Sequence, residues 1–196
     1  MARIAAPTPV YLPYGRLRTF VRGGDLLLWH PSSIAGKVIA WATRAPYSHA
    51  SMAAWHGNRL FNVEMVQWKG GRRVHLSEQL KKFPKACEVW RPNGLCFDGD
   101  GAVHEMLWLV GQEYGWSDLA RIAVHTVLPK FALPKAVDSD DPDVPRVCSA
   151  SYHWAARIGG RIAPCPGTPD LDVSPAMLAA SGFASYIGTP VLSQCD

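Results

Sequence analysis

The sequence lacks the features that define several large classes of protein. It has no apolar run near the ~20 residues that span a bilayer, and residues 1–9 (MARIAAPTP) lack the apolar core of a signal peptide. Its five cysteines are irregularly spaced with no C-x-x-C pair, which argues against a disulfide framework or a zinc knuckle. No H-E-x-x-H motif or other ligand spacing occurs, so we expect neither a metal nor a cofactor.

Charge is also sparse and scattered. Twenty Lys and Arg residues against sixteen Asp and Glu give a net charge of +4, with no dense basic stripe of the kind that binds nucleic acid. A hydrophobic content of 48% over 196 residues is typical of a globular protein with one core. Without a targeting signal we expect a cytoplasmic protein with mostly free thiols, and release from a lysed cell or a place in a virion is compatible with this. Its oligomeric state is not indicated.

The order of patterns predicts an α+β fold. Residues 1–22, rich in Pro and Arg, predict an irregular N-terminal arm, and residues 23–196 a single domain. Strands are expected mostly in the first half and helices in the second. Residues 130–146 predict an acidic surface loop carrying Asp138, Asp140, Asp141 and Asp143, and the tail after residue 182 is expected to be irregular. The expected strands are 26–29, 47–55, 60–66, 72–76 and 87–91; the expected helices are 34–45, 77–80, 102–114, 147–158 and one that begins at 174–175, with a helix or buried segment at 119–128.

Cys148 lies in the first turn of the expected helix 147–158. Small and apolar residues recur there at helical spacing, Pro145 suits the start of a helix, and Gly159 and Gly160 suit its end. Unpaired backbone N–H groups in the first turn of a helix favour a thiolate. Free cysteine is also among the most buried residue types, so position alone leaves a nucleophile and a core residue both open.

Two histidines are the first candidates for a base beside Cys148. His153 follows it by five positions, a rotation of ~140° along a helix, so it should face away, and we expect it at the surface. His49 lies in the expected strand 47–55, where it shares a face with the small residues Ser51 and Ala53. These leave room for a helix end or a substrate, which favours His49.

A hairpin formed by residues 47–66 would give His49 an acidic neighbour. If its four-residue turn pairs Trp55 with Leu60, Glu64 becomes a diagonal neighbour of His49 on the same face. A carboxylate there can fix the tautomer of the imidazole and stabilise its charged form. A slip of one residue would place Met65 there instead.

Four motifs in this order resemble the circularly permuted NlpC-type, papain-like cysteine hydrolases of the YiiX/YebB-like group. They are residues 24–29 (GDLLLW), 47–52 (YSHASM), 61–64 (FNVE) and 147–152 (VCSASY), and the resemblance spans roughly residues 23–182. The Cys motif follows the His motif here, as in the permuted group. The resemblance departs at Ser149-Ala150, where unpermuted relatives usually have Ser-Gly, and in the long acidic insert before Cys148.

The resemblance implies a fold and a set of roles. It implies a small antiparallel half-barrel sheet packed against helices, with Cys148 as the nucleophile, His49 as the base and Glu64 as the third residue. Residues 114–116 (YGW) resemble a family motif that would place Tyr114 near the substrate carbonyl, and a core tyrosine fits this pattern equally well. Ser149 is a further candidate beside the oxyanion.

The expected chemistry is attack of the Cys148 thiolate on a carbonyl, an acyl-thioester intermediate, and its hydrolysis by water that His49 activates. The backbone N–H of Cys148 would hold the oxyanion. The function predicted first is that of an amidase or endopeptidase acting on cell-wall-type peptides. Hydrolysis of, or acyl transfer from, a lipid or fatty-acyl ester or amide by the same chemistry is the alternative, and a non-catalytic binding or virion-assembly module is the third.

Overall fold

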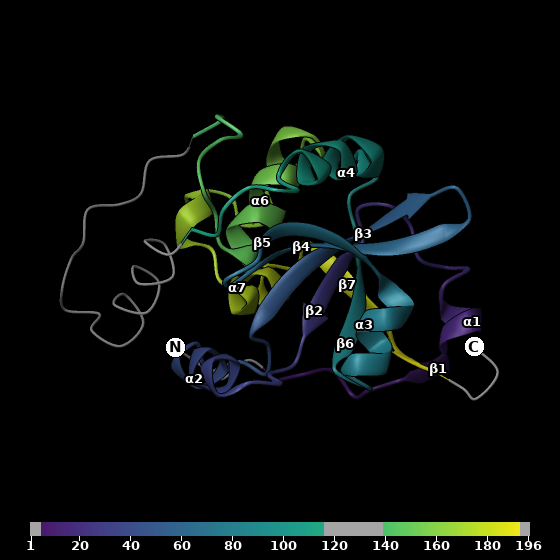
Figure 1. The fold of residues 1–196 in the computed structure, drawn as a ribbon. Helices are drawn as coiled ribbons and strands as arrows, with labels where there is room; N and C mark the ends of the chain where they lie inside the picture. The colour runs from purple at the N-terminus through teal and green to yellow at the C-terminus, as the bar shows by residue number, and fades with distance from the viewer. Residues whose placement is uncertain (1–4, 116–138, 193–196) are drawn as a thin grey trace.

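The computed structural model of the protein describes residues 5–115 and 139–192. The chain is α+β, as predicted (Figure 1). Among the described residues, no helix has the length and apolar character to cross a membrane. The elements in chain order are β1 (Tyr11–Pro13), α1 (Tyr14–Leu17), β2 (Leu26–Trp29), α2 (Ile34–Ala42), β3 (His49–His56), β4 (Arg59–Val66), β5 (Gly70–His75), α3 (Leu76–Lys82), β6 (Cys87–Pro92), α4 (Gly99–Trp108), α6 (Cys148–Ile158), the 3₁₀-helix η1 (Asp170–Asp172), α7 (Pro175–Ala180) and β7 (Ala184–Val191).

The strands form one seven-stranded sheet in the order β1-β7-β6-β2-β3-β4-β5. Pairing is antiparallel except between β1 and β7. In the β3–β4 hairpin Trp55 pairs with Leu60 and Met52 with Val63, which confirms the predicted register. This register decides which side chains of β4 share a face with those of β3.

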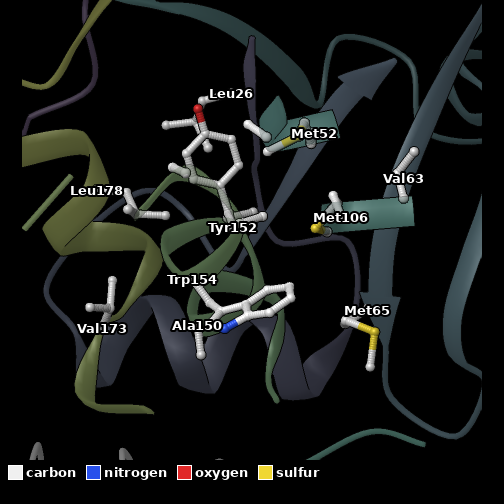
Figure 2. Close-up of a cluster of buried hydrophobic side chains, with 14 of the residues drawn as sticks. Leu26, Met52, Val63, Met65, Met106, Ala150, Tyr152, Trp154, Val173 and Leu178 are labelled. Atoms are coloured by element: carbon white, nitrogen blue, oxygen red, sulfur yellow. The ribbon is translucent and has the colours of Figure 1, made fainter. Parts of the chain in front are cut away.

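Both faces of the sheet are covered, so its central strand β2 is apolar throughout. Leu26 and Leu28 pack with residues of α4, α6 and α7, whereas Leu27 and Trp29 pack with residues of α1 and α3. This burial on both faces explains the continuous LLLW run, because a strand with one solvent-exposed face would alternate apolar and polar residues. Figure 2 shows the larger cluster, where Tyr152 and Trp154 of α6 lie among Leu26, Met52, Met65 and Leu178.

Two segments expected to be irregular are ordered. The N-terminal arm contains β1 and α1, and its Tyr14, Leu17 and Val21 are buried in the cluster on the α3 face. The tail after residue 182 forms β7, which pairs with β6 and β1. Short strands beside polar or Pro-containing sequence give little periodicity, and tertiary pairing decides them. The division at residue 22 stays a prediction.

Helix α2 packs through small residues. Its N-cap is Ser33, whose side chain accepts from the Gly36 N–H. The large apolar residues Ile34, Val38 and Trp41 have the spacing of a buried helix face, yet they are 83%, 56% and 74% exposed. The helix packs instead through Gly36 and Ala40.

The other long helix of the first half also differs in its bounds. α4 begins at Gly99, with Asp98 as its N-cap, and ends at Trp108 rather than spanning 102–114. Residues 119–128 and the acidic loop up to residue 138 lie outside the described residues.

Helices α4 and α6 approach closely because Gly101 of α4 faces Gly159, the C-cap residue of α6. A Cβ atom built on Gly101 would lie 2.4 Å from the Gly159 carbonyl oxygen, and one on Gly159 would lie 2.1 Å from that of Gly101. Both obstacles are backbone atoms, which cannot rotate aside. This contact holds α6, and thus Cys148 at its start, against the rest of the core.

Gly101→Ala should therefore destabilise the protein. We expect a loss of about 1–3 kcal/mol, typical of overpacking, and a Tm lower by about 3–10 °C. Thermal unfolding followed by circular dichroism measures it. The matched control is Gly23→Ala, whose added Cβ meets only side-chain atoms at 3.5 and 3.6 Å. Equal stability of the two variants would show that the α4–α6 contact is loose.

Candidate active site

Cys148 is the first residue of α6, as predicted, and its side chain is buried. Burial alone raises the pKa of a thiol, but three contacts act against it. The His49 charge and hydrogen bond, and the backbone N–H groups of Ala50 and Ser149, lower the pKa of Cys148 below its ordinary value. The start of α6 and the start of β3 together thus favour the thiolate over the thiol.

His49 is the first residue of β3 and lies between Cys148 and Glu64. Its Nε2 lies 2.8 Å from Oε2 of Glu64, so Nδ1 is the ring nitrogen left for the hydrogen bond with Cys148. Burial acts to lower the pKa of His49. The thiolate charge and the hydrogen bonds to Cys148 and Glu64 outweigh burial and raise it to about 10. The favoured state of the pair is therefore thiolate and imidazolium.

Glu64 is buried on β4 and receives hydrogen bonds from three elements. Besides His49, Arg72 on β5 donates from Nε and Nη2 to Oε1 at 2.9 and 2.6 Å, and Gln79 on α3 donates to the same oxygen at 2.6 Å. Burial acts to raise its pKa. The His49 hydrogen bond and charge, followed by those of Arg72, lower it to about 2. Glu64 is thus a fixed negative charge that orients the imidazole.

The three residues line one pocket of about 230 Å³. Its wall is contributed by α2, the β4–β5 turn, α3 and the start of α6. Glu64 is the one acidic residue among the described lining residues, whereas Lys69, Arg72 and Lys82 are basic. Apolar lining comes from Trp29, Ile39, Met65, Val66, Phe83 and Ala86.

The two further candidates occupy different places. Tyr114 lines the same pocket as Cys148 and forms a β-bridge with Arg146, two residues before the cysteine. The hydroxyl of Ser149 is buried and donates to the Val173 carbonyl at 2.7 Å, so only its backbone N–H reaches the thiolate.

His153 was expected at the surface and is buried. It does face away from Cys148, but its Nδ1 lies 2.6 Å from Oδ1 of Asp170 on η1, and Arg157 donates to the same carboxylate. The periodicity gave its direction correctly. It could not show that η1, distant in sequence, covers this side of α6.

Two features of the pocket were not found from the sequence. One is the set of residues that donate hydrogen bonds to Glu64, and the other is a second polar group at the pocket. Arg72 is the cross-strand partner of Glu64, a pairing that the β4–β5 register would have revealed. His30 also lines the pocket, and its Nε2 lies 2.8 Å from buried Glu88, which accepts from Tyr47 and Trp90 as well. No local pattern marks Glu88, because His30 and Tyr47 come from the connection between β2 and β3, and Trp90 comes from β6.

Comparison with known proteins supports the fold and leaves the activity open. No family model matches the sequence, and no curated protein matches it. Among solved structures, the chain is similar to the crystal structure of the metalloprotein yiiX from Escherichia coli O157:H7. The TM-score is 0.53 at 18% identity, over 86% of this chain and 97% of that one. The YiiX-like fold named by the sequence resemblance is therefore found again in three dimensions.

The likeness to a metalloprotein does not extend to a metal site among the described residues. In residues 5–115 and 139–192, no three His, Cys, Asp or Glu side chains are grouped so as to hold a metal ion. The clustered groups at the pocket are instead paired with one another, as a thiol, an imidazole and a carboxylate.

The paired site predicts an unusual pH dependence for alkylation of Cys148. Because the pKa of Cys148 is lowered, its thiolate persists as pH falls. The rate of Cys148 alkylation by iodoacetamide should therefore stay nearly constant down to about pH 6. Free cysteine, with a pKa of about 8.5, is largely protonated at that pH. In Glu64→Gln the imidazolium loses its carboxylate, so the rate at about pH 6 should fall about tenfold. Mass spectrometry of the labelled peptide gives the rate at Cys148 alone.

Gln79→Met is the matched control for Glu64→Gln. It removes one hydrogen bond to Glu64 but keeps the negative charge of that residue. The alkylation rate of Cys148 at low pH should therefore fall less than it does in Glu64→Gln. Circular dichroism checks that both variants fold. A wild-type rate that rises steeply toward pH 9, as it does for free cysteine, would contradict the paired thiolate.

Proposed function

We propose that the protein is a cysteine hydrolase that cleaves an acyl bond through a thioester, with Cys148 as nucleophile, His49 as base and Glu64 as the residue that orients it. The observation that carries this proposal is the chain of contacts from the start of α6 through His49 to Glu64. A half-buried histidine bonded on one side to a thiol and on the other to a carboxylate is an arrangement that supports nucleophilic catalysis. The order of the motifs supports a permuted papain-like chain.

In the acylation step the Cys148 sulfur forms a bond to the substrate carbonyl carbon, and the carbonyl oxygen becomes an oxyanion. Backbone N–H groups in the first turn of α6 stabilise this charge, because they have no partner within the helix. The His49 imidazolium then gives its Nδ1 proton to the leaving amine or alcohol as the bond to the carbonyl carbon breaks.

In the deacylation step neutral His49 removes a proton from water, and the resulting hydroxide attacks the thioester carbonyl. The C–S bond breaks, the Cys148 thiolate is restored, and His49 is again an imidazolium beside Glu64. We expect Tyr114, which lines the same pocket, to contact the bound acyl group. Each role belongs to a residue that lines one cavity.

Two classes of substrate fit this chemistry. The sequence favours a cell-wall-type peptide amide, and the basic lining residues Lys69 and Lys82 suit the carboxylates of such peptides. An acyl ester or amide of a lipid uses the same steps, and the apolar part of the lining suits its chain.

Cys148→Ala and His49→Ala should each abolish turnover and leave the fold intact. We expect loss of at least about 10³-fold in kcat, since each removes a group that acts in bond making. Purified muropeptides and short- and long-chain acyl esters, assayed in parallel by product chromatography, measure it.

Cys96→Ala is the matched control, because that thiol is exposed and absent from the pocket lining. It should turn over substrate at the wild-type rate. Wild-type-like activity in Cys148→Ala would end the proposal. A reactive Cys148 thiolate with no turnover of any acyl substrate would favour the non-catalytic binding module.

A further inference from the structure

Helix α2 carries a row of large apolar side chains that point to solvent. Ile34, Val38 and Trp41 are 83%, 56% and 74% exposed. At about 100° per residue they lie within about 60° of one another, opposite the face that packs through Gly36 and Ala40. Single exposed apolar residues are ordinary on a protein surface, whereas a row on one helix face indicates a binding surface.

A second exposed aromatic residue lies at the same pocket. Trp68, 85% exposed, stands in the β4–β5 turn between Gln67 and Lys69, which both line the cavity of Cys148. α2 contributes Gly36 and Ile39 to that cavity. We name Ile34, Val38, Trp41 and Trp68, with Lys37 and Lys69, the α2 rim. The α2 rim therefore lies on two elements, α2 and the β4–β5 turn, that form part of the wall of the candidate active site.

The segment of sequence that holds the α2 rim is rich in basic residues. Residues 26–87 contain nine Lys and Arg against two acidic residues, Glu64 and Glu78, so the rest of the chain holds eleven basic and fourteen acidic residues. Glu64 is buried and paired with Arg72 and His49, whereas Lys37, Lys69 and Lys82 are exposed. In Figure 1, α2 lies at the lower left, and the chain that follows residue 139, with its aspartates, lies far above it.

We propose that the α2 rim docks on an anionic lipid surface and that the substrate of Cys148 is an acyl lipid that enters the pocket from this surface. Exposed Trp and aliphatic side chains flanked by lysines are the composition of helices that lie in the plane of a membrane interface. Each lysine near such a surface adds electrostatic attraction. The substrate half rests on the proposed hydrolase activity, and the docking half does not. This surface favours the lipid over the soluble peptide.

Vesicle binding by the full chain tests the docking half, with Cys148→Ala used so that substrate turnover plays no part. Sedimentation with vesicles of phosphatidylcholine alone is set beside vesicles of equal phosphatidylcholine and phosphatidylglycerol. We expect binding to the anionic vesicles, falling as salt is raised, and little to the neutral ones. Equal binding to both, or none to the anionic vesicles, would overturn the proposal.

Two pairs of variants place the surface. Trp41→Ser should weaken binding about tenfold, whereas Trp108→Ser on α4, 59% exposed outside the rim, should not. Lys37→Glu should weaken it at least about fivefold, whereas Arg59→Glu, at the far end of the β3–β4 hairpin, should have less effect. If both variants of a pair lost the same amount of vesicle binding, the attraction would be general and not located at the α2 rim, which would overturn the proposed surface.

Oxidative footprinting of Trp41 and Trp108, read by mass spectrometry, separates the other occupants. We expect Trp41 to be labelled in the free protein and protected by anionic vesicles, with Trp108 labelled throughout. Protection of Trp41 in the absence of vesicles would overturn the proposal. If that protection were lost on dilution, a second copy of the protein would occupy the surface. If it persisted at every protein concentration, another part of the protein's own chain would cover it.

Activity tests the substrate half separately. Trp41→Ser should lose turnover of a long-chain acyl ester in anionic vesicles about as much as it loses binding. It should keep turnover of a dissolved short-chain ester. Vesicle binding with turnover of muropeptides alone would overturn the lipid substrate and leave docking and hydrolysis standing. Binding with no turnover of anything would sink the hydrolase proposal and leave the docking.

Discussion

The site depends on one buried negative charge. The carboxylate of Glu64 would cost several kcal/mol to bury alone, and it is retained because donors surround it. Those donors come from β3, β5 and α3, so forming the charge network also fixes where these three elements meet. With Oε1 taken by Arg72 and Gln79, Oε2 is left for His49, which determines how the imidazole turns. Stability and the proposed chemistry therefore depend on the same contacts.

The position of Cys148 depends on backbone packing rather than on charge. α6 is held by its small residues against the sheet and by the Gly101–Gly159 contact with α4. Immediately before it, Arg146 is buried, donates to the carbonyls of Ser139, Asp141 and Val144, and lies 4.4 Å from the centre of the Trp154 ring. The acidic stretch before Cys148 is therefore tied to α6 by an arginine over an aromatic ring. That arrangement sets the first turn of α6 opposite the start of β3.

The sequence was informative wherever a local pattern also decided the tertiary contact. The expected turn between Trp55 and Leu60, which in the structure comprises residues 57–58, set the hairpin register. That register placed Glu64 beside His49. The helical spacing around Cys148 gave both ends of α6. It failed where a distant segment decides the outcome: η1 buries His153, and pairing with β6 and β1 makes residues 184–191 a strand. Arg72 and Gln79 were missed for the same reason, since their partner Glu64 lies on another element. Glu88 was missed because His30 and Tyr47 lie outside β6.

Helix α2 shows a further limit of pattern reasoning, and it bears on function. Apolar residues at Ile34, Val38 and Trp41 are spaced as on a buried face, yet the helix turns its small residues Gly36 and Ala40 inward. A helix packed through small side chains lies close to its support but buries little apolar area. Its larger residues therefore contribute little to folding and stay exposed at the surface. In the proposed docking, the side chains that the fold leaves exposed are those that carry the active-site entrance to a lipid surface.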